Sequence, residues 1–172
     1  MKTLLLTAML FGLVAALQAQ EPPSVLSEAQ SLAGTWYIKA VVNYKAPAQV
    51  FPVTVTALEG GNLEGRVTIM HEGRCHEIKV RMLKTDEPGK YIELGGKKVV
   101  YIESLPMKDH AIFLCEGQHE GKPFRFAKLM GKNPEENPEA LEEFKKFTQR
   151  KGFQLESIYV PKQKDACISE NN

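Results

Sequence analysis

From Gly34 onward, short runs rich in Val, Ile, Thr, Tyr and Phe alternate with turn residues at intervals of about ten. This pattern is typical of an all-β protein, because β-branched and aromatic side chains suit a pleated, half-buried surface. The predicted strands cover residues 35–43, 50–58, 62–70, 75–84, 91–94, 98–104, 111–118 and 124–131.

The connections between these runs contain residues that tolerate a positive φ, as tight hairpins require. They are Gly60-Gly61, Glu72-Gly73, Pro88-Gly89, Gly95-Gly96, Lys108-Asp109 and Glu120-Gly121. Each strand is therefore expected to pair antiparallel with the next. Eight hairpin-linked strands leave two open edges unless the sheet closes, so the sequence predicts an eight-stranded antiparallel up-and-down barrel.

One segment, residues 137–152, has a helical pattern instead, with Leu141, Phe144, Phe147 and Thr148 recurring at helical spacing. Asn137 is suited to cap this helix, because its side chain can accept a hydrogen bond from the first turn. We expect one C-terminal α-helix whose apolar stripe packs on the outside of the barrel. Residues 157–160 are expected to add a short final strand.

The first residues resemble a signal peptide, with Lys2 followed by an apolar stretch and small or polar residues at Ala19 and Gln20. The apolar stretch is about 14 residues long, shorter than the roughly 20 that span a membrane. We therefore expect cleavage after Ala19, a single domain over residues 20–172, secretion to the extracellular space and no membrane insertion.

Charge and cysteine content narrow the range of functions. Removal of residues 1–19 takes one lysine from a chain of net charge +1 and leaves 0. Basic and acidic residues are mixed, without the basic stripe of a nucleic-acid binder. Cys75, Cys115 and Cys167 allow three pairings in an oxidising compartment. They lack the spacing of a zinc site, and we expect no metal and no cofactor.

Gly34-Thr35-Trp36 resembles the Gly-x-Trp motif of the lipocalin family. Residues 58–64, 84–91, 108–117 and 139–144 resemble the subgroup that contains tear lipocalin (von Ebner's gland protein), type II odorant-binding proteins and vomeronasal secretory proteins. The resemblance implies a calyx that holds a small hydrophobic ligand, and a Cys75–Cys167 disulfide with Cys115 free. It also implies that Trp36 closes one end of the barrel, where Lys132 takes the position of the family's usual arginine.

Alternation with period two then predicts the ligand-contacting side chains, given an inward Trp36 and the apolar pattern of each strand. On the first four strands they are Ile38, Ala40 and Val42, Phe51, Val53, Val55 and Ala57, Val67 and Ile69, and Ile78, Val80 and Met82. By analogy with relatives, the later strands add Val99, Tyr101, Phe113, Cys115, Phe124 and Phe126. Periodicity alone favours a filled core, and the family resemblance indicates a cavity.

Lys128 shares the alternation of Phe124 and Phe126, so its ammonium is expected to point inward. Burial of an unpaired ammonium is unfavourable and lowers its pKa. One interpretation is an anchor for a carboxylate, phenol or aldehyde oxygen of an apolar ligand. The other is a lysine satisfied internally by Tyr101, Glu103 or water.

The predicted function is a secreted, non-enzymatic carrier of odorants, pheromones, fatty acids or similar lipids. We expect a monomer or weak dimer, with a cell-surface receptor as a further candidate partner.

A secreted interaction protein, such as a protease inhibitor or receptor ligand, would instead use the loops at the open end. An enzyme resembling the family's prostaglandin isomerase would use Cys115. A siderophore carrier is disfavoured because only one inward cation is predicted. The short connection at residues 43–49 predicts a wide entrance.

Overall fold

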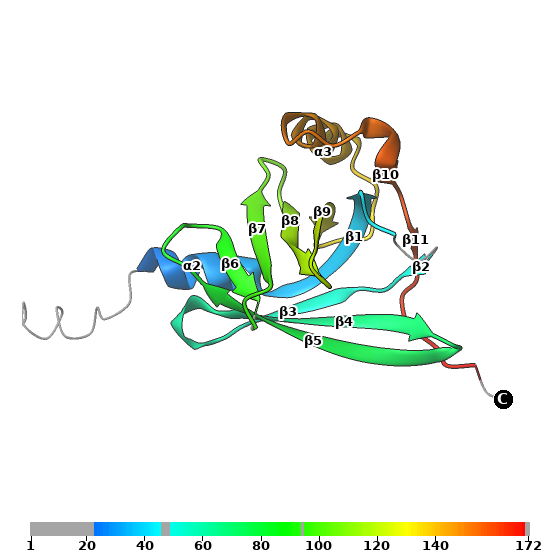
Figure 1. The fold of residues 1–172 in the computed structure, drawn as a ribbon, viewed down its shortest axis with the longest axis horizontal. Coiled ribbons are helices and arrows are strands. Elements are labelled where there is room, and N and C mark those ends of the chain that lie inside the picture. The colour runs from blue at the N-terminus through cyan, green and yellow to red at the C-terminus, as the bar shows by residue number, and fades with distance from the viewer. Residues whose placement is uncertain (1–22, 46–48, 94, 171–172) are drawn as a thin grey trace, which may run out of the picture.

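The computed structural model describes residues 23–45, 49–93 and 95–170 (Figure 1). The predicted signal peptide and the tip of the 43–49 connection lie outside these residues. Eight strands form the barrel wall: β1 (Gly34–Val42), β3 (Val53–Ala57), β4 (Leu63–His71), β5 (Arg74–Lys84), β6 (Lys90–Glu93), β7 (Lys98–Ser104), β8 (His110–His119) and β9 (Lys122–Gly131). Each pairs antiparallel with the next, and β9 returns to β1. The predicted closed up-and-down barrel is confirmed.

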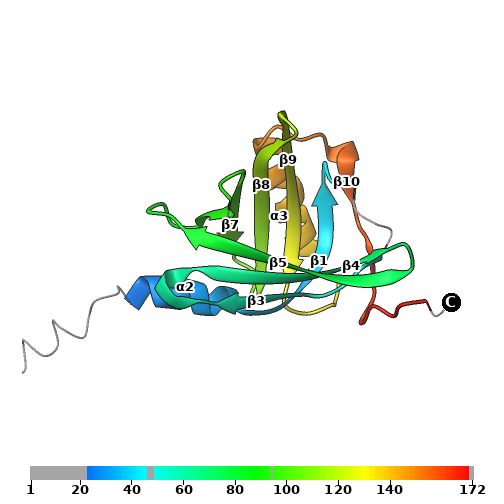
Figure 2. The same ribbon diagram turned by 60° about the horizontal axis from the view of Figure 1, so that its bottom comes forward.

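The C-terminal helix α3 (Pro138–Arg150) packs outside the barrel, as predicted, and lies behind β8 and β9 in Figure 2. Asn137 Oδ1 accepts a hydrogen bond from the backbone N–H of Ala140 at 3.0 Å, which satisfies one free donor of the first turn. The buried face of α3, with Ala140, Phe144 and Phe147, shares an outer apolar cluster with Ile112 and Leu129 of the wall.

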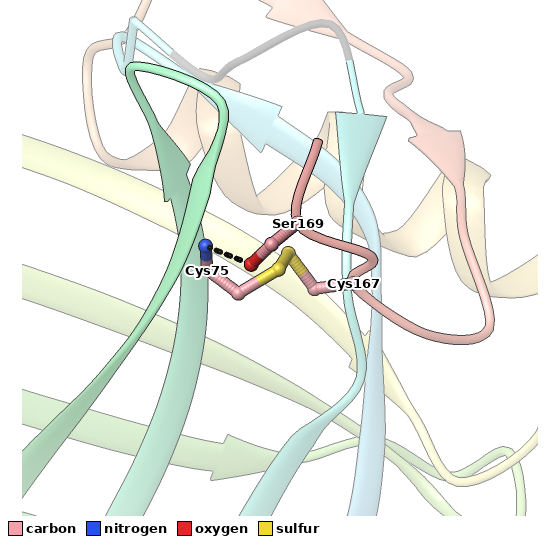
Figure 3. The surroundings of a disulfide bond; sticks show 3 residues. All are labelled: Cys75, Cys167 and Ser169. Atoms are coloured by element: carbon pink, nitrogen blue, oxygen red, sulfur yellow. Dashed lines mark hydrogen bonds between the residues drawn. A yellow bond between two sulfur atoms is a disulfide. The ribbon is translucent and has the colours of Figure 1, made fainter. Parts of the chain in front are cut away.

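The C-terminal segment wraps around the barrel as an arm. After the short helix η2 (Leu155–Ser157), β10 (Ile158–Tyr159) pairs with β1, and β11 (Lys162–Gln163) pairs in parallel with β2 (Gln49–Val50). The disulfide between Cys75 and Cys167 ties the arm to the start of β5, as the family resemblance implied. Figure 3 shows Ser169 beside it, and its Oγ accepts a hydrogen bond from the Cys75 N–H at 3.2 Å.

Sequence patterns did not predict the helix α2 (Pro23–Leu32), which precedes β1 and contacts the short helix η1 (Glu59–Gly61). Its last residue, Leu32, accepts a hydrogen bond from Trp36 Nε1 at 2.8 Å. Glu28 Oε1 accepts hydrogen bonds from the Gly89 N–H at 3.0 Å and the Tyr91 hydroxyl at 3.1 Å. These bonds fasten α2 across the end of the barrel where β1 begins.

An irregularity in β1 changes which of its side chains face the interior. The pairing of β1 with β9 shifts register between Ile38 and Ala40. A bulge inserts one residue, so the alternation reverses beyond it. Val41 therefore joins the interior cluster, whereas Ala40 and Val42 pack in the outer cluster beneath α3. The predicted inward orientation of Ala40 and Val42 is wrong for this reason.

The alternation of β7 also differs from the prediction. Val100 and Ile102 belong to the interior cluster, and Tyr101 packs against the outer one. Val99, which has the same parity as Tyr101, therefore faces outward too. Residues 99–102 are all apolar or aromatic, so hydropathy does not distinguish the two faces of this strand. The predicted inward orientation of Val99 and Tyr101 is wrong.

Loss of the disulfide tests how far the arm stabilises the fold. We expect the double variant Cys75→Ser, Cys167→Ser to lose about 2–4 kcal/mol of unfolding free energy, because the bond closes a long loop in the unfolded chain. Urea denaturation measures the loss. Reduced wild-type protein should match the variant, and equal stability of all three samples would contradict the account.

Candidate ligand-binding site

A cavity of about 270 Å³ lies toward the open end of the barrel, between β1, β2, β4 and β9. Its lining is mainly apolar, and Lys128 supplies the one charged side chain among the described residues that line it. The lining residues are Ile38, Tyr44, Gln49, Val50, Phe51, Val67, Thr68, Ile69, Met70 and Lys128. A mostly apolar hollow with one charged group has the composition of a small-molecule pocket.

Most of the predicted contact residues belong to this interior. The interior cluster and the partly buried side chains against it include Ile38, Val53, Val55, Val67, Val80, Met82, Phe113, Cys115 and Phe126. Of the predicted contacts, Ile38, Phe51, Val67, Ile69 and Lys128 line the cavity itself. Phe124 stacks on Phe126 with ring centroids 5.9 Å apart, while Ile78 is 43% exposed on the projecting part of β5.

Lys128 enters the cavity between two aromatic rings. Its Nζ lies 4.7 Å from the ring centroid of Tyr44 and 5.5 Å from that of Phe126. Among the described residues no carboxylate forms an ion pair with it. Burial lowers the pKa of Lys128, the Cys115 thiol opposes that shift, and the like charge of Lys98 adds to it.

Two of the internal partners considered for Lys128 are not available to it. Tyr101 packs against the outer cluster, on the other face of the wall. Glu103 is exposed and lies 4.0 Å from Arg150 of α3. Contact with aromatic faces favours the ammonium without neutralising its charge. Lys128 therefore offers a hydrogen-bond donor to whatever occupies the cavity.

A second ammonium, which the sequence analysis missed, lies close to the first. Lys98 Nζ is 5.9 Å from the Phe126 ring centroid, so both lysines approach the same ring. Unlike Lys128, Lys98 has an ion-pair partner, Glu93 Oε2, at 2.9 Å. Lys98 lies on the same face of β7 as Val100 and Ile102. Its inward position was not predicted from the sequence because the opposite face of β7 was assigned to the interior.

Cys115 lies deep in the same interior and is the one free cysteine among the described residues. Burial raises the pKa of its thiol, and the nearby charges of Lys98 and Lys128 only partly oppose that effect. The nucleophilic form of cysteine is the thiolate, so this environment keeps Cys115 in its unreactive form. The described residues contain no cluster of three His, Cys, Asp or Glu side chains suited to a metal ion.

Trp36 and Lys132 occupy the opposite, closed end of the barrel. The Trp36 side chain is buried and lies 5.9 Å from Phe113 between ring centroids. Lys132 Nζ lies 5.2 Å from the Trp36 ring and donates to the Ser31 carbonyl of α2 at 2.7 Å. The lysine thus combines a cation–π contact with a bond to the covering helix.

A larger hollow, about 460 Å³, lies between α3 and the outer side of β7 and β8. Tyr101, Ile112, Leu114 and Phe147 line it, together with charged groups such as Arg125 and Lys151. Arg125 is already engaged there, with its Nε 3.1 Å from Glu116 and its guanidinium 4.4 Å from the Phe153 ring centroid. The interior cavity, with its unpaired lysine, is the stronger candidate site.

The model of the lipocalin / cytosolic fatty-acid binding protein family matches residues 33–165. The chain belongs to this family. Odorant-binding protein 2a of Mus musculus is 45% identical over 99% of this chain and 100% of its own length. Lipocalin-1 of Sus scrofa is 44% identical over 98% of both chains.

Solved structures share the fold. That of the siderocalin Ex-FABP has a TM-score of 0.70 and 21% sequence identity, and it covers 80% of this chain and 97% of that one. At this identity the likeness concerns the architecture alone. Within the described residues of this lipocalin, no helix is both long and apolar enough to cross a membrane.

The charge of Lys128 gives the protein a specific pH dependence. Its pKa is lower in the folded state than in the unfolded state, so the unfolded state binds more protons between the two values. Wild-type stability therefore gains from this group as pH rises through that window, and the burial penalty applies in full below it. Lys128→Met should stabilise the fold at pH 7 by about 1 kcal/mol.

Urea denaturation of both proteins at neutral and at alkaline pH measures this difference, which should shrink as pH rises. The matched control is Lys122→Met, at an exposed position of the same strand, which should leave the profile unchanged. A destabilised Lys128→Met variant at neutral pH would show that the ammonium is satisfied inside the empty barrel.

Proposed function

We propose that this lipocalin carries small hydrophobic molecules in its barrel and that Lys128 binds the polar end of the cargo. The observation that carries the proposal is the apolar cavity of about 270 Å³ with an unpaired ammonium in its wall. Binding of a carboxylate, phenol or aldehyde oxygen would give that ammonium the partner it lacks among the described residues. The similarity to odorant-binding protein 2a supports the same class of cargo.

The size of the cavity favours odorants and pheromone-sized molecules or medium-chain acids over long-chain lipids. Ligand pockets generally span about 300–1,000 Å³, so this one is close to the lower limit. Burial of about ten methylenes contributes roughly 8 kcal/mol gross, and a charge-assisted hydrogen bond to Lys128 adds about 1.5–3 kcal/mol. Ordering and lost translational freedom offset several kcal/mol, which leaves roughly micromolar affinity. A carrier with that affinity can also release its cargo.

We also propose that the protein is secreted and has no catalytic role. The apolar N-terminal stretch and the Cys75–Cys167 disulfide both suit an exported protein, because structural disulfides persist in oxidising compartments. Burial of Cys115 argues against an isomerase, since a thiol held in its protonated form is a poor nucleophile.

Displacement of a fluorescent naphthylamine probe tests the carrier directly. We expect graded acids and aldehydes to compete at roughly micromolar concentration. Lys128→Met should weaken the acids by about tenfold or more, because a charge-assisted hydrogen bond is lost, and should change alkanes of the same length by less than about twofold. Lys122→Met serves as the control. Failure of the folded wild type to bind the probe would overturn the proposal.

A further inference from the structure

The barrel wall contains a strand edge that is unpaired over most of its length. β5 pairs with β4 from Arg74 to Met82, but with β6 only at Met82, Leu83 and Lys84. Figure 1 shows β5 running away from β6 and β7 beyond this short contact. Among the described residues, no strand pairs with the other edge of residues 74–81.

The backbone groups on that edge follow from the β4–β5 turn. Glu72 and Gly73 both have positive φ, and the flanking pair His71 and Arg74 closes a two-residue hairpin. The two residues of such a flanking pair are hydrogen-bonded to each other through their backbones. The backbone N–H and C=O groups of the even-numbered residues of β5 therefore bond to β4, and those of the odd-numbered residues point away from β4. The bond from the Cys75 N–H to Ser169 fits this assignment. Glu77, Lys79 and Arg81 therefore present N–H and C=O groups to the open edge.

The outward side chains along this edge carry an unbalanced charge pattern. Lys79 lies directly opposite Arg66 of β4, and no carboxylate among the described residues forms an ion pair with it. Glu77, two residues earlier, makes only a 3.9 Å contact with Arg66, and its side chain is 54% exposed. Ile78 lies between them in the sequence, points to the opposite face with Val80, and is 43% exposed. This edge therefore has unused charge and apolar surface as well as backbone groups.

We propose that β5 pairs with β5 of a second copy of this chain, antiparallel, about a two-fold axis at Ile78. This register places Glu77 of each copy opposite Lys79 of the other, in two hydrogen-bonded pairs that each exchange both N–H···O bonds. Ile78 then faces its own copy at a non-hydrogen-bonded position, where side chains approach most closely. The pairing is isologous and closes, so it gives a dimer and not a fibre.

Charge selects this register over its neighbours. Only odd-numbered residues have free backbone groups on this edge, so an odd-numbered residue must pair with an odd-numbered residue. The nearest alternative registers therefore slide one strand by two residues relative to the other. One shift places Lys79 opposite its own copy, and the other places Glu77 opposite Glu77. Like charges directly opposite one another destabilise a sheet. A peptide of other sequence would have no such reciprocal match, so the second copy fits this edge best.

The contact is short, because Ser169 already occupies the edge at Cys75 and β6 occupies it from Met82 onward. We therefore expect a weak dimer that forms in a concentration-dependent way, at roughly 10 µM to 1 mM. The proposal does not rest on the proposed cargo, because the edge lies in the wall and its paired side chains at positions 77 and 79 face outward.

Analytical ultracentrifugation over that concentration range tests the pairing with charge reversals. Either Glu77→Lys or Lys79→Glu places like charges opposite one another and should weaken the dimer by about tenfold. The double variant Glu77→Lys, Lys79→Glu restores opposite charges and should dimerise within about threefold of the wild type. Each variant is checked for wild-type circular dichroism and probe binding. Absence of self-association up to about 1 mM, or a dimer that ignores both reversals, would overturn the proposal.

Cross-linking tests the position of the axis. In a Cys115→Ala background, Ile78→Cys should form an intermolecular disulfide under mild oxidation, because the two side chains meet at the axis. The control is Thr56→Cys, which should remain monomeric. Thr56 is exposed on β3, and β3 already pairs with β1 on one side and β4 on the other. Equal cross-linking at both positions would place the contact elsewhere and contradict the pairing through β5.

Discussion

Closure of the sheet through β1 and β9 is the constraint on which the rest of the structure depends. In a closed antiparallel sheet, alternate side chains face the interior, and each strand's alternation must agree with that of its two neighbours. β1 meets two demands at once, since Trp36 and Ile38 face the interior while Ala40 and Val42 pack beneath α3. The bulge after Ile38 makes both possible, because it reverses the alternation within one strand.

The same constraint explains the two lysines that face the barrel interior. In β9, the side chain of Lys128 lies on the same face as that of Phe126, which faces the interior once β9 pairs with β1 and β8. In β7, Lys98 faces the interior for the same reason, because it lies on the same face as Val100. The two lysines differ in their surroundings. Lys98 is paired with Glu93 at 2.9 Å, whereas Lys128 contacts the faces of Tyr44 and Phe126 and has no carboxylate partner in the described part of the chain. An ammonium left unpaired inside an apolar barrel reduces stability and provides a donor for ligand recognition. In the proposed carrier, the ammonium whose burial reduces stability is the group that binds the cargo.

The sequence allowed the eight strands, the helix α3 and the closed barrel to be predicted, because hairpin turns and hydropathy are local signals. It did not allow the bulge to be predicted, because a register shift depends on the partner strand and not on the residues of β1 alone. The uniform run of apolar residues 99–102 in β7 carried no alternation, so the inward Lys98 was missed. The helix α2 also escaped prediction. It is held by contacts such as the bond from Trp36 Nε1 to the Leu32 carbonyl, which come from elsewhere in the fold.

A crystal structure with a brominated medium-chain fatty acid is the most direct test of the account. Anomalous scattering would locate the bromine, and the electron density would locate the carboxylate. The account predicts a chain between Ile38, Val50 and Val67 with its carboxylate about 3 Å from Lys128 Nζ. A fatty acid seated in the outer groove beneath α3, with the barrel interior unoccupied, would contradict it.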